Sequence, residues 1–112
     1  MSVRVRTTGG IRDLVESIEQ RAERYLDLVD RHAIEHNAEV RRQWPRGPRA
    51  RSLRAFREDV HRNRVNMRRT LVNDAPHIRW VRLEGGAFAW PTLVVKGWEP
   101  HRKAIESEGF RG

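Results

Sequence analysis

His32 and His36, four residues apart, are the pair of residues whose spacing best fits a metal-binding or catalytic site. His32 and His36 flank Glu35 in the pattern His-x-x-Glu-His, which in one class of zinc peptidases supplies two metal ligands and a general base. In a helix, however, both histidines fall on the apolar stripe, whereas Glu35 falls on the opposite, polar face. A third ligand from a downstream helix would have to come from the C-terminal tail. We therefore predict no metal site and interpret the histidines as residues at the core edge or at a contact between subunits.

Other combinations of reactive side chains lack the surroundings that catalysis requires. Ser52, Asp74 and His77 are the residue types of a hydrolytic triad, but no nucleophile elbow or glycine-rich oxyanion loop accompanies them. Gly85 and Gly86 lie outside any phosphate-binding frame and are interpreted as a turn. The chain has no cysteine, which excludes disulfides and thiolate metal ligands. We predict a protein that is not an enzyme and has no cofactor.

The segment 44–82 is the strongest candidate for a functional surface. It holds eleven arginines, no lysine and three acidic residues, in a chain whose formal net charge is +8. These arginines could dock on another protein or contact nucleic-acid phosphates without reading sequence, with Trp80 as a stacking face. The candidate docking or DNA-facing residues are Arg46, Arg49, Arg51, Arg54, Arg64, Arg68 and Arg79.

Three alternatives compete with direct nucleic-acid binding and are together favoured over it. Arginines often solvate exposed strand faces. Their excess over lysine, 21 to 2, also reflects GC-rich coding. They could finally pair with an acidic helix face on a neighbouring copy of the chain, which would give a head-to-tail interface of complementary charge.

An amphipathic helix predicted over residues 11–43 would supply that acidic face. Thr8 is its expected N-cap and Pro45 ends it. About 33 residues make a helix of roughly 50 Å, longer than a 112-residue globule, so one end should project and need a partner. Its apolar residues form one stripe at positions 11, 14, 15, 18, 22, 25, 26, 29, 33 and 40. The candidate subunit-interface residues on this helix are Glu16, Glu19, Glu23, Asp27, Asp30, His32 and His36.

The remaining segments predict an α+β fold, in which the long helix packs on a small antiparallel sheet within one domain. Residues 3–7 alternate as a short edge strand, residues 45–51 form a basic Pro/Gly loop, residues 52–95 form the sheet, and residues 98–108 form a short helix. No apolar run approaches the roughly 20 residues that span a bilayer, so we expect a soluble protein with no membrane partner.

Within the predicted sheet, strand-like runs occupy 52–60, 64–73 and 77–84. The apolar run 88–95 is either a last strand or a segment wedged under the helix. In the second run Val65, Met67 and Leu71 share one face, and Arg69 is the exception on that face. In the final helix, Trp98, His101 and Ile105 lie on one side.

The order of these pieces resembles a family of small neck and tail-completion proteins of long-tailed phages, the group that includes the minor tail protein Z type. Members have a long N-terminal helix, a proline with a T-G-x-[LS]-R-x-S-like segment, a strand pair, an N-x-A-x-Y-A-x-Y-I-like strand and a proline-containing segment before a last helix. Here these elements correspond to Trp44-Pro45 with Arg51-Ser52-Leu53, to residues 72–81, and to Trp90-Pro91 through Lys103. Residues 47–50 replace the Thr-Gly pair, and His77 stands where an aromatic residue is usual.

The resemblance implies a structural virion protein at the head–tail junction, made in the host cytoplasm. Tail terminators and head-closure proteins are relatives with similar small sheets, and their roles stay open beside that of a neck protein. Such a subunit would form part of an oligomeric ring at the DNA channel, and the resemblance suggests a hexameric one. Its partners would be copies of itself, the adjacent neck, head-closure and tail proteins, and the packaged DNA. The alternative is a basic nucleic-acid-binding domain without sequence preference.

Overall fold

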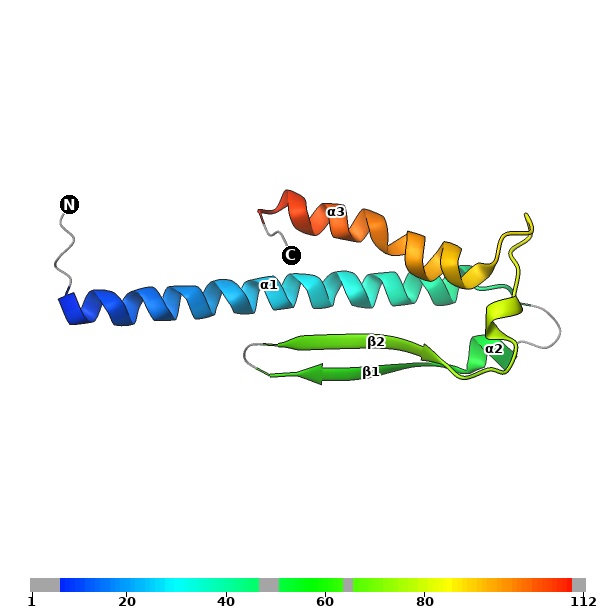
Figure 1. Ribbon diagram of the computed structural model, residues 1–112, viewed down its shortest axis with the longest axis horizontal. Coiled ribbons are helices and arrows are strands. Elements are labelled where there is room, and N and C mark those ends of the chain that lie inside the picture. Colours follow the sequence, from blue (N-terminus) through cyan, green and yellow to red (C-terminus); the bar gives the residue numbers. More distant parts are fainter. Residues whose placement is uncertain (1–6, 47–50, 64–65, 110–112) are drawn as a thin grey trace.

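The chain has the predicted α+β fold, with a long N-terminal helix, a two-stranded antiparallel sheet and a short C-terminal helix (Figure 1). The computed structural model describes residues 7–46, 51–63 and 66–109, with side chains from Leu14 onward. Its elements are α1 (Thr7–Gln43), α2 (Arg51–Arg54), β1 (Phe56–Arg62), β2 (Met67–Asn73), the 3-10 turns η2 (Ile78–Trp80) and η4 (Lys96–Trp98), the π-helical segment η3 (Trp90–Val95) and α3 (Glu99–Ser107).

Helix α1 ends where the sequence predicts and begins earlier. Arg41 and Arg42 lie in its last turn, where their charge complements the helix dipole, and Pro45 follows its end. Gly9 and Gly10 lie inside the helix and do not break it. Each glycine costs about 1 kcal/mol of helix propensity, which the long cooperative helix that follows can offset. Thr7 is therefore helical, not part of a strand, and residues 3–6 of the predicted strand lie outside the described residues.

The middle and C-terminal parts of α1 lie between two other elements (Figure 1). The β1–β2 hairpin runs along one side, paired antiparallel in a register from Phe56 opposite Asn73 to Arg62 opposite Met67. The helical stretch formed by η3, η4 and α3 runs along the other side. The long helix is thus the central layer, and its first turns extend beyond both neighbours.

The predicted sheet over residues 52–95 is too large. The run 52–60 begins with the short helix α2, and only its second part is a strand. The run 77–84 forms the 3-10 turn η2 and then one isolated bridge, from Arg82 to Phe88. The run 88–95 enters the π-helical segment η3, with Pro91 in its first turn, where a missing N–H costs least. Short apolar runs do not distinguish a strand from a buried helical segment, which explains the error.

The core lies at the C-terminal end of α1. Val40 and Trp44 are each 1% exposed, and Ala89 is fully buried against them. Phe56 packs edge-to-face on Trp44 at 4.9 Å and stacks on Trp90 at 6.3 Å between ring centroids. The buried indole N–H of Trp44 donates to Ser52 Oγ at 3.0 Å. This aromatic cluster fixes hairpin, helix and η3 together, because aromatic pairs add to the burial of apolar area.

Candidate functional site: the projecting end of the long helix

Residues 14–20 of α1, the first whose side chains are described, carry an exposed apolar surface that no other part of the described chain covers. Every side chain from 14 to 20 is exposed, although Leu14, Val15 and Ile18 are large and apolar, with exposed fractions of 61%, 48% and 60%. Ile18 lies four residues after Leu14 and three after Val15, the spacings at which helical side chains are neighbours, so the three form one patch. We call Leu14, Val15 and Ile18 the helix-tip patch.

The shape of the molecule explains this exposure. It measures 68 × 24 × 17 Å, and the hairpin and α3 both stop beside the middle of α1 (Figure 1). The apolar stripe of α1 continues past that point, and Leu28 is the first buried residue among the described side chains of the helix. A stripe that continues beyond its own core is typical of a surface that another protein covers. Among the described residues, no helix is long and apolar enough to cross a membrane.

The acidic residues predicted for a subunit interface divide into two groups. Glu16, Glu19 and Glu23 lie on the exposed, projecting part of α1. Asp27 and Asp30 bind arginines of the hairpin in the same chain. Arg62 Nη2 donates to Asp27 Oδ1 at 2.5 Å, and Arg69 Nε donates to Asp30 Oδ1 at 2.7 Å. For these two aspartates, charge complementarity acts within one copy and fastens the hairpin to α1.

Arg69 is the centre of this attachment. Its side chain is 15% exposed and also binds Glu58 Oε2 at 3.1 Å, while Asn37 Nδ2 donates to Glu58 Oε1 at 2.8 Å. The hydrogen bond to Asp30 is the main reason why the pKa of Arg69 lies above its ordinary value. Arg69, the one charged residue on the otherwise apolar strand face, therefore points to α1 and pairs with Asp30 there.

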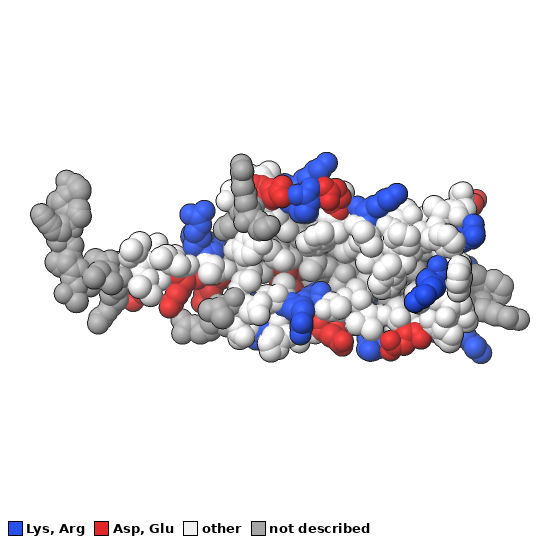
Figure 2. Space-filling view, viewed as in Figure 1, with Lys and Arg blue, Asp and Glu red and all other residues white. Residues whose placement is uncertain are grey.

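The predicted arginine surface is only partly assembled. Arg46, Arg51, Arg54 and Arg79 are exposed at the end of the molecule opposite the helix tip, and none has an ion-pair partner in the described ranges. Arg68 is exposed on the hairpin, away from that end, and Arg49 and Arg64 lie outside the described residues. Trp80, next to Arg79, is 66% exposed. On the face shown in Figure 2, basic and acidic side chains are interspersed over the hairpin and α3.

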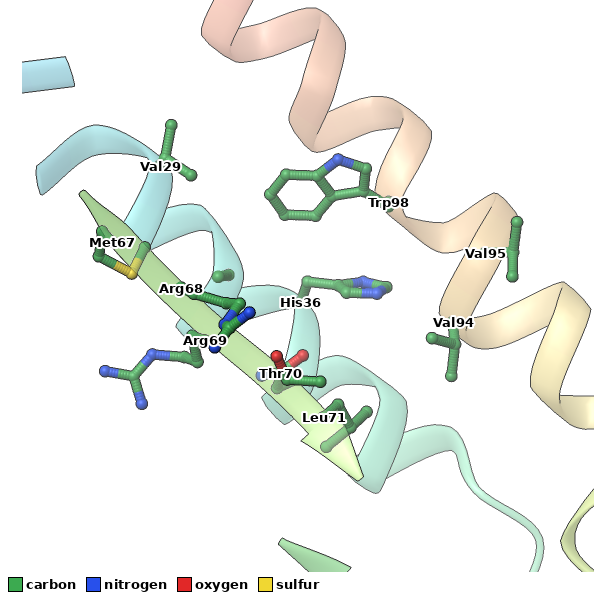
Figure 3. A pocket seen from close by; sticks show the side chains of 12 residues that line it. Val29, His36, Met67, Arg68, Arg69, Thr70, Leu71, Val94, Val95 and Trp98 are labelled. Carbon is green, nitrogen blue, oxygen red and sulfur yellow. The ribbon is translucent and has the colours of Figure 1, made fainter. Parts of the chain in front are cut away.

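A groove beside the core offers a second apolar surface. It has a volume of about 550 Å³ and lies between β2 and the η3–η4 stretch, with α1 as its floor (Figure 3). Met67 and Leu71 line one side, and Val94, Val95 and Trp98 line the other. Val95 is 63% exposed at this groove. Arg68 and Arg69 also line it, and because Arg69 is paired with Asp30 and Glu58, Arg68 supplies the basic charge of this wall.

The two histidines, predicted to lie at the core edge or at a subunit contact, pack inside the chain. His36 is 5% exposed, and the side chain of His32 is 14% exposed. Both meet His101 of α3, a residue that sequence reasoning did not select, although the shared side of Trp98, His101 and Ile105 already indicated that it packs. Burial, and secondly His101, lower the pKa of His36 from its ordinary value of 6.5, while the Val94 backbone and Glu39 oppose this shift.

Ser52, Asp74 and His77, the residue types of a hydrolytic triad, do not act as one in the structure. Ser52 is buried, and its hydroxyl accepts the Trp44 N–H. Asp74 is ion-paired with Arg57. His77 is exposed in the turn before η2. Ser52 and Asp74 therefore each serve local structure.

Comparisons of the chain with protein-family models, with curated proteins and with solved structures find no match. The function of the chain is therefore inferred from its own residues and geometry.

Proposed function

We propose that this protein is a structural subunit that acts by assembling with copies of itself into a ring. The observation that carries the proposal is the helix-tip patch, three large apolar side chains on a helix that extends beyond its own fold. Burying a Leu or Ile side chain contributes roughly 1.5–3 kcal/mol, so the patch offers a substantial driving force for association. The phage neck, where the sequence resemblance points, is the setting that we propose for this ring.

The groove between β2 and η3–η4 is the surface that we propose for the helix tip of the next copy. Both surfaces are apolar, and their charged rims are complementary: Glu16 and Glu19 lie beside the patch, and Arg68 lines the groove. An amphipathic helix laid in an apolar groove is a common mode of recognition. Because patch and groove lie on different parts of the molecule, the contact is head-to-tail, and it gives a ring when the rotation between successive copies closes.

The arginines at the opposite end, Arg46, Arg51, Arg54 and Arg79, would then face an adjacent ring or the DNA channel. Their exposure and their lack of ion-pair partners in the described part of the chain support this role. In the neck, the ring would join the DNA-filled head to the tail, and its other partners would be the neighbouring neck, head-closure and tail proteins.

A stop codon at Trp44 in the genome that encodes the chain tests the neck assignment, with electron microscopy of the particles produced. We expect full heads beside separate finished tails, or heads that leak DNA. A synonymous change at Arg46 is the matched control. Normal infectious particles from the stop-codon genome would contradict the neck assignment.

Nucleic-acid binding without sequence preference is the second candidate, favoured by exposed Trp80 beside Arg79. A free phosphate-binding domain should lose affinity for DNA steeply as salt rises, because each neutralised phosphate releases counterions. Titration of single-stranded DNA at several salt concentrations, with Trp80→Ala and Arg79→Ala, tests this candidate. Negligible binding at moderate salt would eliminate it.

A further inference from the structure

The three histidines that meet between α1 and α3 form a cluster with an ordered geometry. His32 Nδ1 and His101 Nδ1 are 2.9 Å apart, so one ring donates an N–H to the other. His36 and His101 have ring centroids 5.6 Å apart, and the Trp98 ring stacks on His101 at 5.6 Å. Residues far apart in the sequence thus bring three imidazoles together at the contact between two helices.

His36 is the residue that this packing leaves unexplained. It is 5% exposed, and neither ring nitrogen makes a hydrogen bond of ordinary length and angle in the described chain, although the Val94 backbone lies near enough to oppose the lowering of its pKa. Figure 3 shows its ring directed from α1 towards the stretch that carries Val94, Val95 and Trp98. Gly97 leaves room for the ring, because a Cβ there would lie 3.2 Å from His36 Cε1. A buried polar ring without a partner normally costs stability, which indicates that it binds something.

Two sets of side chains could place three ligand atoms around one ion. One set is His32, Glu35 and His101, and the other is His36, Glu39 and His101. Only the second set gives His36 a partner. In this set His101 would bind through Nε2, the nitrogen that does not face His32, and this atom lies 3.4 Å from Glu39 Oε2. Two ligands about 2.0–2.1 Å from a tetrahedral zinc ion are roughly 3.3 Å apart, so this separation fits a shared metal.

The remaining contacts fit the second set as well. A histidine that binds a metal through one nitrogen usually donates its other N–H to a neighbouring group, which fixes the ring. With Nε2 of His101 on the metal, its Nδ1–H would donate to His32 Nδ1 at the observed 2.9 Å. His32 is then an orienting residue, and Glu35, whose side chain is 54% exposed, is left outside the site.

We propose that His36, Glu39 and His101 bind one divalent transition-metal ion, with Zn²⁺ as the best fit to two imidazoles and a carboxylate. The ion would fasten α3 to α1 as a structural clasp, with its fourth position open to water. All three ligands come from one copy of the chain and none belongs to the helix-tip patch, so the site can be tested on unassembled protein, although His36 also lines the groove.

Isothermal titration of the untagged full-length protein with ZnCl₂ tests the site. We expect one zinc per chain and a higher melting temperature on binding, because a ligand of the folded state stabilises it. His36→Gln and His101→Gln should abolish binding, and Glu39→Gln should weaken it by more than about tenfold. Glu35→Gln on the same helix and His77→Gln at an exposed position are the matched controls and should bind as the wild type does.

The side chain of Glu39 is 39% exposed, so Glu39→Gln should stay folded, which circular dichroism checks. No saturable binding by the wild type would overturn the proposal. Weakening by Glu35→Gln and not by Glu39→Gln would also overturn it, because the ion would then lie on the other edge of His101.

Discussion

Arg69 links polar side chains of two elements through one guanidinium. Its partners Asp30 and Glu58 have side chains 18% and 22% exposed, so removal of the arginine leaves two carboxylates largely shielded from water and without their cation. We predict that Arg69→Met lowers the free energy of unfolding by about 1–3 kcal/mol, measured by urea denaturation. His61→Gln, at an exposed position of the same hairpin outside the groove, is the control and should change it by less than about 0.5 kcal/mol. Equal effects of the two substitutions would contradict this role of Arg69.

At this scale, the sequence indicated which residues were unusual but not what they contact. Arg69 was visible as a charge on an apolar strand face, and His32 and His36 as polar residues on an apolar helix stripe. Asp30 lies 39 residues from Arg69, and His101 lies 69 residues from His32. Single-sequence periodicity carries no information about such long-range pairs, so His101 was missed.

The contact between α1 and α3 should depend on pH, because His36 is buried between these elements and faces His101, Glu39 and Trp98. The pKa of His36 is lowered in the folded chain. Above pH 6.5 the residue is neutral in both states and has no effect. Below that pH the unfolded chain takes up a proton that folded His36 resists, so stability falls until the pH passes the folded pKa.

We therefore predict, with chelator present, that the free energy of unfolding decreases as the pH falls below 6.5, measured by urea denaturation at several pH values. His36→Gln should show a shallower decrease, and His77→Gln should keep the wild-type profile. A wild-type profile in His36→Gln would show that another group causes the dependence.

Helix α1 should have two regions of different local stability. The segment 33–44, which spans the last turns of α1 and Trp44, contributes the buried side chains Ala33, Val40 and Trp44, whereas every side chain of residues 14–20 is exposed. We predict that amide hydrogens of 14–20 exchange much faster than those of 33–44 in unassembled protein, because local opening there disrupts few contacts. In assembled protein, 14–20 should gain protection. Hydrogen-exchange mass spectrometry measures both, and equal protection of the two regions in both states would contradict this.

Longer elements were predicted more accurately from the sequence than shorter ones. A stripe repeated over roughly thirty residues predicted α1 and its end, and the shared side of Trp98, His101 and Ile105 predicted α3. The short runs 77–84 and 88–95 were predicted as strands or left open, because a few apolar residues fit several structures. The secondary structure of these two runs depends on their packing around Trp44 and Ala89. That packing joins residues far apart in the sequence, so the sequence pattern of each run alone does not reveal it.

The molecule is elongated, with the helix-tip patch and nearby exposed glutamates towards one end of α1 and exposed arginines at the opposite end (Figure 1). The length of the helix alone predicted that one end projects. The groove could not be predicted, because it exists only where β2 and the η3–η4 stretch lie over the same face of α1. The groove offers a surface that could receive the helix-tip patch of another copy, so that the same contact repeats from one copy to the next.

The mass of the protein in solution, alone and in mixtures of two variants, tests the proposed assembly most directly. Leu14→Asp/Ile18→Asp removes the patch, and Val95→Asp places a charge in the groove. Val60→Asp, exposed on the hairpin outside the groove, is the control. Each of the first two variants should be monomeric by light scattering, because each lacks one half of a head-to-tail contact.

We predict that the wild type and Val60→Asp form a closed oligomer of one defined mass. Mixing the patch variant with the groove variant should give a dimer and nothing larger, since only one intact patch and one intact groove remain to pair. A monomeric wild type, or patch and groove variants that keep the wild-type mass, would contradict the proposed assembly.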